Sequence, residues 1–179
     1  MTRQVAVVRD RVDAVGFEEY VAGARHRLFR FAVVLCGDPV LADDIVTNVL
    51  GRAFERWYQV AAADNVHAYV RRMVVNEYLT WRRRGTYSAP HADVAALVDR
   101  GGGNPDHGEH HAERDALLGE LAHLPRQQRA AIVLRFYEGL SDDEIAAVLD
   151  CRPGTVRSSI SRGLATLRIV MTASIAEEG

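Results

Sequence analysis

The sequence predicts an all-α protein made of two small helical domains joined by a flexible linker. Apolar residues recur at three- and four-residue spacing along most of the chain, and no stretch alternates as a half-buried strand would. A glycine-rich segment divides the chain near its middle. With 179 residues, 48% of them apolar, the chain can form two small cores.

The first half of the chain is expected to contain three helices. Periodic apolar residues predict the first over residues 17–36 and the second up to about Trp57. Asp38 is a suitable N-cap for the second helix, and Pro39 suits its first turn. A loop is expected over 58–65, followed by a third helix over 66–84. The residues expected to face inward are Tyr20, Ala24, Leu28, Phe31, Leu35, Ile45, Val49, Ala53, Trp57, Val66, Tyr69, Val70, Met73 and Val74.

Residues 85–112 differ in composition from both flanks and are interpreted as a linker. Because such a segment offers little to bury, we expect the two halves to move relative to each other in the free protein. His107, His110 and His111 lie close together within it. The glycine-rich context offers no fixed scaffold for metal ligands, which favours a solvated linker over a metal site.

Helical periodicity resumes at Glu113 and continues to the C-terminal region. A stripe of leucines ends at Pro125, and the next helix is expected over 126–139. The sequence of residues 141–144, Ser-Asp-Asp-Glu, is a capping box that opens a short helix ending near Leu149. After a turn, Pro153 starts a last helix that reaches about Val170. The residues expected to face inward are Leu117, Leu121, Leu124, Ile132, Val133, Phe136, Val156, Ile160, Leu164 and Leu167.

The charge is nearly balanced overall but unevenly distributed. The formal net charge is −2, and all 22 basic residues are arginine. Residues 66–84 carry five arginines and one acid, and residues 152–168 carry four arginines and none. Local basic stripes on a nearly neutral chain suit a protein that contacts DNA at chosen places.

Other sequence signals are few. Cys36 and Cys151 lie in unlike contexts, so we expect two small buried hydrophobes and no disulfide or metal site. No apolar run is long enough to span a membrane, and no signal peptide is expected, which predicts a cytoplasmic protein.

The last two predicted helices form a helix-turn-helix pattern, in which the second helix enters the major groove of DNA. An ordinary helical hairpin with a solvated basic face fits the spacing about equally well. If the pattern reads DNA, the candidate contacts are Arg152, Thr155, Arg157, Ser158, Ser161 and Arg162.

A resemblance to a known family favours the DNA-binding alternative. The second half resembles region 4 of sigma-70-type transcription factors, the region that reads the minus-thirty-five promoter element. The motifs that carry this resemblance are Leu124-Pro125-Arg126-Gln127-Gln128-Arg129, residues 132–141, Glu144-Ile145-Ala146 and Gly154-Thr155-Val156-Arg157-Ser158.

The first half resembles region 2 of the same family. The motifs are Leu35-Cys36-Gly37-Asp38, residues 42–46, Arg52-Ala53-Phe54, residues 68–72, Val75-Asn76-Glu77 and Trp81-Arg82-Arg83-Arg84. Two such regions joined only by a linker are typical of the extracytoplasmic-function type, and the chain is most similar to its actinobacterial sigma-E-like subgroup. The resemblance implies a region 2 domain over 1–84 with a short extension over 1–15, a linker over 85–112 and a region 4 domain over 113–179.

The resemblance also implies partners and contact residues. The expected partners are promoter DNA, an anti-sigma factor in some settings, and core RNA polymerase, through the clamp helices of its largest subunit and the flap of its second-largest subunit. No catalytic group, cofactor or metal is expected. The residues implied for polymerase binding are Asp43, Asp44, Thr47, Asn48 and Arg52. Those implied for the minus-ten element are Asn65, Arg71, Arg72, Asn76, Arg83 and Arg84.

Some positions depart from the family pattern. Thr47 and Asn48 stand where glutamine and an acid are common, Thr80 where aspartate is common, and Ser159 where arginine is common. These departures put individual contacts in doubt, and the change at 159 raises the prospect of a shifted minus-thirty-five preference. Asp150 replaces a common glycine in the turn, where aspartate tolerates a left-handed backbone.

Three other functions would each require different features of the sequence. A helix-turn-helix regulator acting without polymerase would need a receiver or ligand-binding domain in the first half. A nucleic-acid enzyme would need a carboxylate or metal set that the sequence lacks. A degenerate sigma-like adaptor that binds polymerase but reads no promoter remains open, given the departures at Thr47, Asn48 and Ser159.

Overall fold

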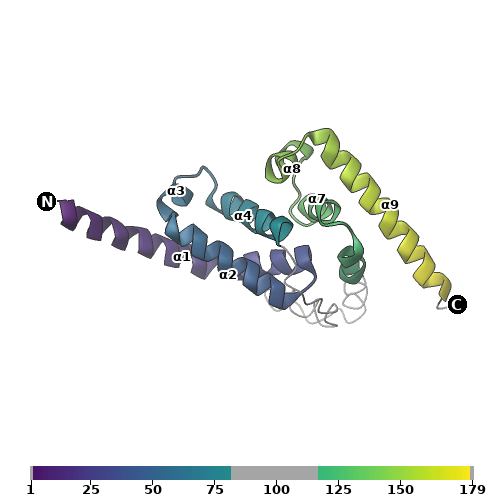
Figure 1. Ribbon diagram of the computed structural model, residues 1–179, viewed down its shortest axis with the longest axis horizontal. Helices are drawn as coiled ribbons and strands as arrows, with labels where there is room; N and C mark the ends of the chain where they lie inside the picture. Colours follow the sequence, from purple (N-terminus) through teal and green to yellow (C-terminus); the bar gives the residue numbers. More distant parts are fainter. Residues whose placement is uncertain (1, 82–116, 178–179) are drawn as a thin grey trace.

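The computed structural model describes the backbone of residues 2–81 and 117–177, and the side chains of residues 16–81 and 117–169. Every regular element in these ranges is a helix, which confirms the predicted all-α class (Figure 1). We call 2–81 the N-terminal unit and 117–177 the C-terminal unit. The predicted linker and its three histidines lie outside the described residues.

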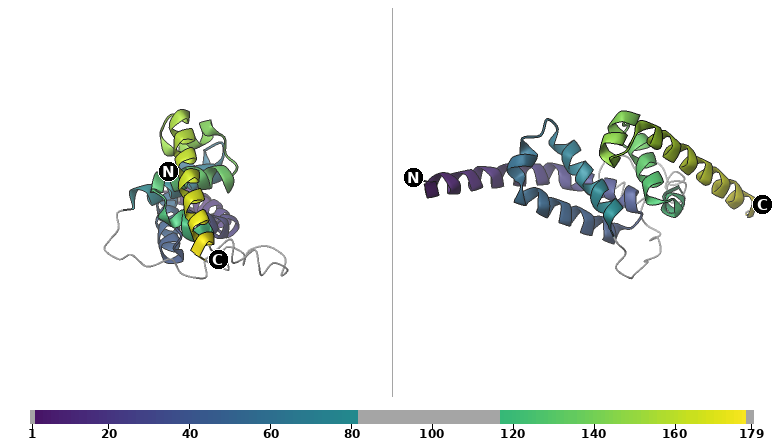
Figure 2. Two further views of the ribbon diagram at one scale, coloured as in Figure 1. Left: turned by 90° about the vertical axis from the view of Figure 1, so that its right-hand side faces the viewer. Right: turned by 45° about the horizontal axis from the view of Figure 1, so that its top comes forward.

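The N-terminal unit packs three helices around one core. These are α1 (Thr2–Cys36), α2 (Pro39–Glu55) and α4 (Val66–Thr80). The N-terminal part of α1 projects beyond the bundle in Figure 1 and in the right-hand view of Figure 2. Asp38 caps α2 as predicted, because its carboxylate accepts hydrogen bonds from the backbone N–H groups of Val40 and Leu41.

The loop predicted over 58–65 begins too early in the sequence. A short helix, α3 (Trp57–Ala61), continues after α2, so the irregular segment covers only 62–65. Trp57 and Val60 are buried, and this anchoring keeps the extra turn helical. Most residues expected to face inward are buried, but Tyr69 is 38% exposed.

The C-terminal unit consists of helical residues 117–123, α7 (Arg126–Phe136), α8 (Asp142–Leu149) and α9 (Pro153–Glu177). The capping box forms as predicted. Ser141 Oγ accepts from the Glu144 N–H, and the Glu144 carboxylate accepts from the Ser141 N–H at 2.8 Å. Asp150 adopts the left-handed conformation, with φ of 51°, and thereby ends α8.

Helix α7 is buried on more sides than its sequence periodicity predicts. All six residues from 129 to 134 are buried, because α7 packs against α9 on one side and against the N-terminal unit on the other. Phe136, expected inside, is 65% exposed. It lies in the last turn of α7, at the end of this doubly packed stretch.

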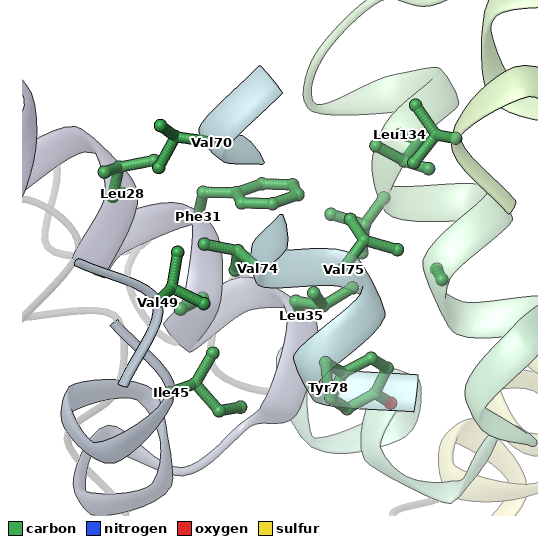
Figure 3. Packing of buried hydrophobic residues seen from close by; sticks show 14 of the residues in the cluster. Leu28, Phe31, Leu35, Ile45, Val49, Val70, Val74, Val75, Tyr78 and Leu134 are labelled. Carbon is green, nitrogen blue, oxygen red and sulfur yellow. The ribbon is translucent and has the colours of Figure 1, made fainter. Parts of the chain in front are cut away.

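The two units share one hydrophobic core. The main cluster contains Leu35 and Val75 of the N-terminal unit together with Leu134 and Ile145 of the C-terminal unit. Figure 3 shows Leu134 facing Val75 across the junction between α7 and α4. The expectation that the halves move relative to each other in the free protein stays a prediction. Linker composition gave no information about the surfaces that the two units present to each other.

Candidate nucleic-acid interface

Helices α8 and α9 form the helix-turn-helix. They pack against each other, and Val156 of α9 and Leu149 of α8 are both buried. The turn between the two helices spans residues 150–152. The opposite side of α9 faces solvent along its first three turns. Five of the six predicted DNA contacts lie on that exposed side: Thr155, Arg157, Ser158, Ser161 and Arg162. The sixth, Arg152, is exposed in the turn directly before α9.

Side chains on this exposed side are held by neighbours on the protein. Arg157 Nη1 lies 3.4 Å from Asp142 Oδ2 at the start of α8. Arg162 instead donates to the carbonyl and hydroxyl oxygens of Ser158, one turn back on its own helix, at 3.1 and 3.3 Å. The two arginines therefore occupy different positions around the helix, and they can make different contacts with a DNA groove.

Ser159 lies on the other side of α9 and is only 6% exposed. Its position faces the protein interior, so the residue present here does not contribute to the exposed side of the helix. A small serine side chain is therefore compatible with the packing of α9 at position 159 in this chain.

The candidate minus-ten residues differ in their availability. Arg72 and Asn76 are exposed on α4, whereas the Asn65 side chain accepts from the Ala68 N–H as the N-cap of that helix. Arg71 is ion-paired with Glu138 of the C-terminal unit, and both side chains are largely buried. Arg83 and Arg84 lie outside the described residues.

The five residues predicted to bind polymerase all lie on the solvent side of α2: Asp43, Asp44, Thr47, Asn48 and Arg52. Their spacing of three and four residues brings them to one face. Asp43 pairs with Arg25 of α1 at 3.2 Å, and Arg52 pairs with Glu77 of α4. Thr80 is exposed, and its hydroxyl donates back to the Asn76 carbonyl at 2.8 Å.

Sequence reasoning missed two arginines that join the units. Arg126 donates to the Tyr78 carbonyl at 2.9 Å and to the Trp81 carbonyl, and its guanidinium lies 5.2 Å from the Tyr78 ring centre. Arg129 donates to the Leu35 carbonyl at 3.1 Å. These carbonyls lie at or just beyond the C-terminal ends of α1 and α4, where helical partners are missing and the macrodipole favours a cation. Both arginines belong to the motif that resembles region 4. No sequence signal identified their contacts with the N-terminal unit.

Burial shifts the pKa of several titratable groups in the described part of the chain. Burial raises the pKa of the Cys36 thiol to about 12, and the thiol donates to the Asp38 carbonyl at 3.2 Å. Burial, followed by the charge of Arg27, lowers the pKa of His67. Both cysteines are free, and within the described ranges no group of three histidine, cysteine or acidic residues could hold a metal ion. None of the helices described is long and apolar enough to cross a membrane.

Comparisons with known proteins extend these observations. The family model described as sigma-70, region 4 matches residues 114–167. The RNA polymerase sigma-E factor of Streptomyces avermitilis is 37% identical over 158 residues, which cover 87% of this chain and 85% of that protein. The sigma-E factor of Streptomyces coelicolor is 35% identical over 87% of this chain and 86% of its own length. The ECF RNA polymerase sigma factor SigE of Mycolicibacterium smegmatis is 34% identical over 89% of this chain and 63% of its own length.

A solved structure has the same fold. The sigma factor RpoE of Bartonella quintana, crystallised with the anti-sigma factor NepR, matches 88% of this chain and 97% of its own with a TM-score of 0.65 and 22% identity. The sequence identity to the two Streptomyces factors, over 85% and 86% of their length, establishes the family, and the helix-turn-helix geometry agrees with it. The chain belongs to the extracytoplasmic-function sigma factors of the sigma-70 family.

Proposed function

We propose that this chain binds core RNA polymerase in the cytoplasm and directs promoter-specific transcription initiation, contributing no catalytic group of its own. The observation that carries this proposal is that all six predicted reading residues are exposed, five on the solvent side of α9 and Arg152 in the turn before it. The proposed domains are a region 2 domain over 1–84, a linker over 85–112 and a region 4 domain over 113–179.

The C-terminal unit is proposed to read the minus-thirty-five element. In a helix-turn-helix, side chains near the start of the second helix reach base edges in the major groove. Arg157 lies in the second turn of α9 and is proposed to contact a base edge or an adjacent phosphate. Arg162 lies further along and is held against its own helix, which supports a phosphate contact.

The N-terminal unit is proposed to hold the minus-ten element. Arg72 and Asn76 share an exposed side of α4, where they can contact backbone phosphates and unpaired bases. Arg71 can join them only after its ion pair with Glu138 is broken. The solvent side of α2 is proposed to dock on the clamp helices of the polymerase, and the C-terminal unit on the flap. An anti-sigma factor is a further proposed partner.

Run-off transcription with core polymerase on a promoter library tests this function directly. The parent chain should give transcripts from a subset of promoters, and the double variant R157A/R162A should lose that selectivity while still binding core polymerase in a pull-down. R27A is the control, because Arg27 is an exposed arginine on α1 that belongs to none of the proposed contact sets. Core binding without any promoter-dependent transcript would instead support the adaptor function.

A further inference from the structure

One aspartate connects helices α7, α8 and α9 of the C-terminal unit. Asp142 is the first residue of α8, directly after the N-cap Ser141. Its Oδ1 pairs with Arg135 in the last turn of α7, and its Oδ2 lies 3.4 Å from Arg157 Nη1 on α9. The carboxylate thus bridges a scaffold arginine and the arginine proposed to read DNA.

The surroundings of Asp142 fix the position of its carboxylate. The reciprocal hydrogen bonds of the Ser141 and Glu144 capping box hold the first turn of α8. The side chain of Asp142 is 25% exposed and that of Arg135 is 31% exposed, whereas Arg157 is 68% exposed. The bridge is therefore anchored at its α7 end and open to solvent at its α9 end.

An exposed pair of this kind adds little to folding stability, about 0–1 kcal/mol. Its effect on recognition can be larger, because an unrestrained arginine loses rotamer freedom when it binds. Arginine has five N–H donors, and the contact with Asp142 uses one nitrogen. The remaining donors can still form the bidentate contact that distinguishes guanine from other bases.

We propose that Asp142 is a positioning residue that holds Arg157 for reading the minus-thirty-five element. This inference rests on the proposed function, because it requires α9 to be the reading helix. Asp142 itself touches no DNA in this proposal. It preorganises the guanidinium, and Arg135 offsets its negative charge so that phosphates are not repelled.

Asp143 supplies a matched control. It is the next residue in the first turn of α8, is exposed, and forms no ion pair with any other described side chain. D142N and D143N remove the same charge near the DNA, so both should strengthen non-specific duplex binding to a similar degree. Only D142N should release Arg157.

The experiment measures holoenzyme, made from the full chain and core polymerase, on promoters that carry single base changes in the minus-thirty-five element. The base position read by Arg157 is first identified with R157A. At that position, D142N should reduce the preference for the best base about 3- to 10-fold, and D143N should leave it within about 2-fold of the parent. D142E, which restores the carboxylate, should recover the preference.

The outcomes separate this inference from the function on which it rests. If R157A changes selectivity at no position, the assignment of α9 as reader fails. If R157A changes selectivity but D142N matches D143N, the positioning role of Asp142 is overturned. D142N in the R157A background should add no further loss of selectivity. D142S removes the carboxylate with a residue suited to helix starts, and it should reproduce the D142N result if D142N folds poorly.

Discussion

Arg129 joins the two units from within the protein interior. It is a cation only 3% exposed, and it donates to the Leu121 carbonyl of its own unit and to the Leu35 carbonyl of the other. A buried charge is tolerated when polar partners surround it. Helical periodicity did not predict the burial of Arg129 or its hydrogen bond to Leu35, because both depend on α1, which is distant in sequence.

Replacement of Arg129 should therefore destabilise the whole protein. R129A leaves two buried carbonyl oxygens without their donor, and each orphaned group costs about 1–3 kcal/mol. We expect a loss of about 2–4 kcal/mol in the free energy of unfolding, measured with urea. R25A removes an exposed arginine whose partner is also exposed, and should cost less than about 1 kcal/mol. Equal losses for the two variants would contradict the role assigned to Arg129.

Glu144 gives the unfolding free energy of the C-terminal unit a dependence on acid pH. Hydrogen bonds from the backbone and hydroxyl of Ser141 lower its pKa from the ordinary value of 4.5. A carboxyl whose folded pKa is depressed contributes stability above the unfolded pKa and loses it as the pH falls through the folded pKa. The E144Q variant should therefore lose less stability than the parent on acidification below about pH 4.5. Thermal unfolding followed from about pH 7 to pH 3 tests this, and parallel curves for the two proteins would contradict it.

At the scale of elements, amphipathic spacing located the helices that bury one face. The apolar positions Ile45, Val49 and Ala53 of α2 are all buried, and the polar positions between them are exposed. Spacing failed for α7, which is buried on two sides, so exposed Phe136 could not be told from its buried neighbours. The site residues of α9 were predicted correctly as exposed. The orientation of the Arg157 side chain depends on its contact with Asp142 of α8, which only the fold supplies.

The solvent side of α2 is expected to decide affinity for core polymerase. Asp44 is exposed in the middle of this side. Reversing its charge in D44R should weaken core binding about tenfold, equivalent to about 1.4 kcal/mol. E19R makes the same charge reversal at an exposed position of α1 and is the control. Fluorescence titration of labelled chain with core polymerase measures both, and equal affinity for the two variants would exclude α2 as the docking element.

The whole molecule presents a conflict between its packing and its proposed task. Contacts that include the Arg71–Glu138 ion pair hold α4 directly against the C-terminal unit, and Figure 2 shows the same junction from two further sides. Elements named for positions ten and thirty-five lie about 25 base pairs apart, or roughly 85 Å along B-DNA. Units in mutual contact cannot occupy both elements of a straight duplex at once. The arrangement described here must therefore open before both elements are bound.

The Arg71–Glu138 pair is the point at which this opening can be tested. Both side chains are largely buried, so E138R places two like charges together at the junction and should separate the units while leaving each unit folded. Small-angle X-ray scattering of the free chain should give a larger radius of gyration for E138R than for the parent. E55R reverses the charge of an exposed residue at the end of α2, and it should leave the radius of gyration unchanged. In holoenzyme, E138R should retain promoter-specific transcription, because the broken contact is absent from the open form and Arg71 is released toward DNA. An unchanged radius together with lost transcription would show that Glu138 serves a contact needed in the active complex, and that the junction is not a barrier to opening.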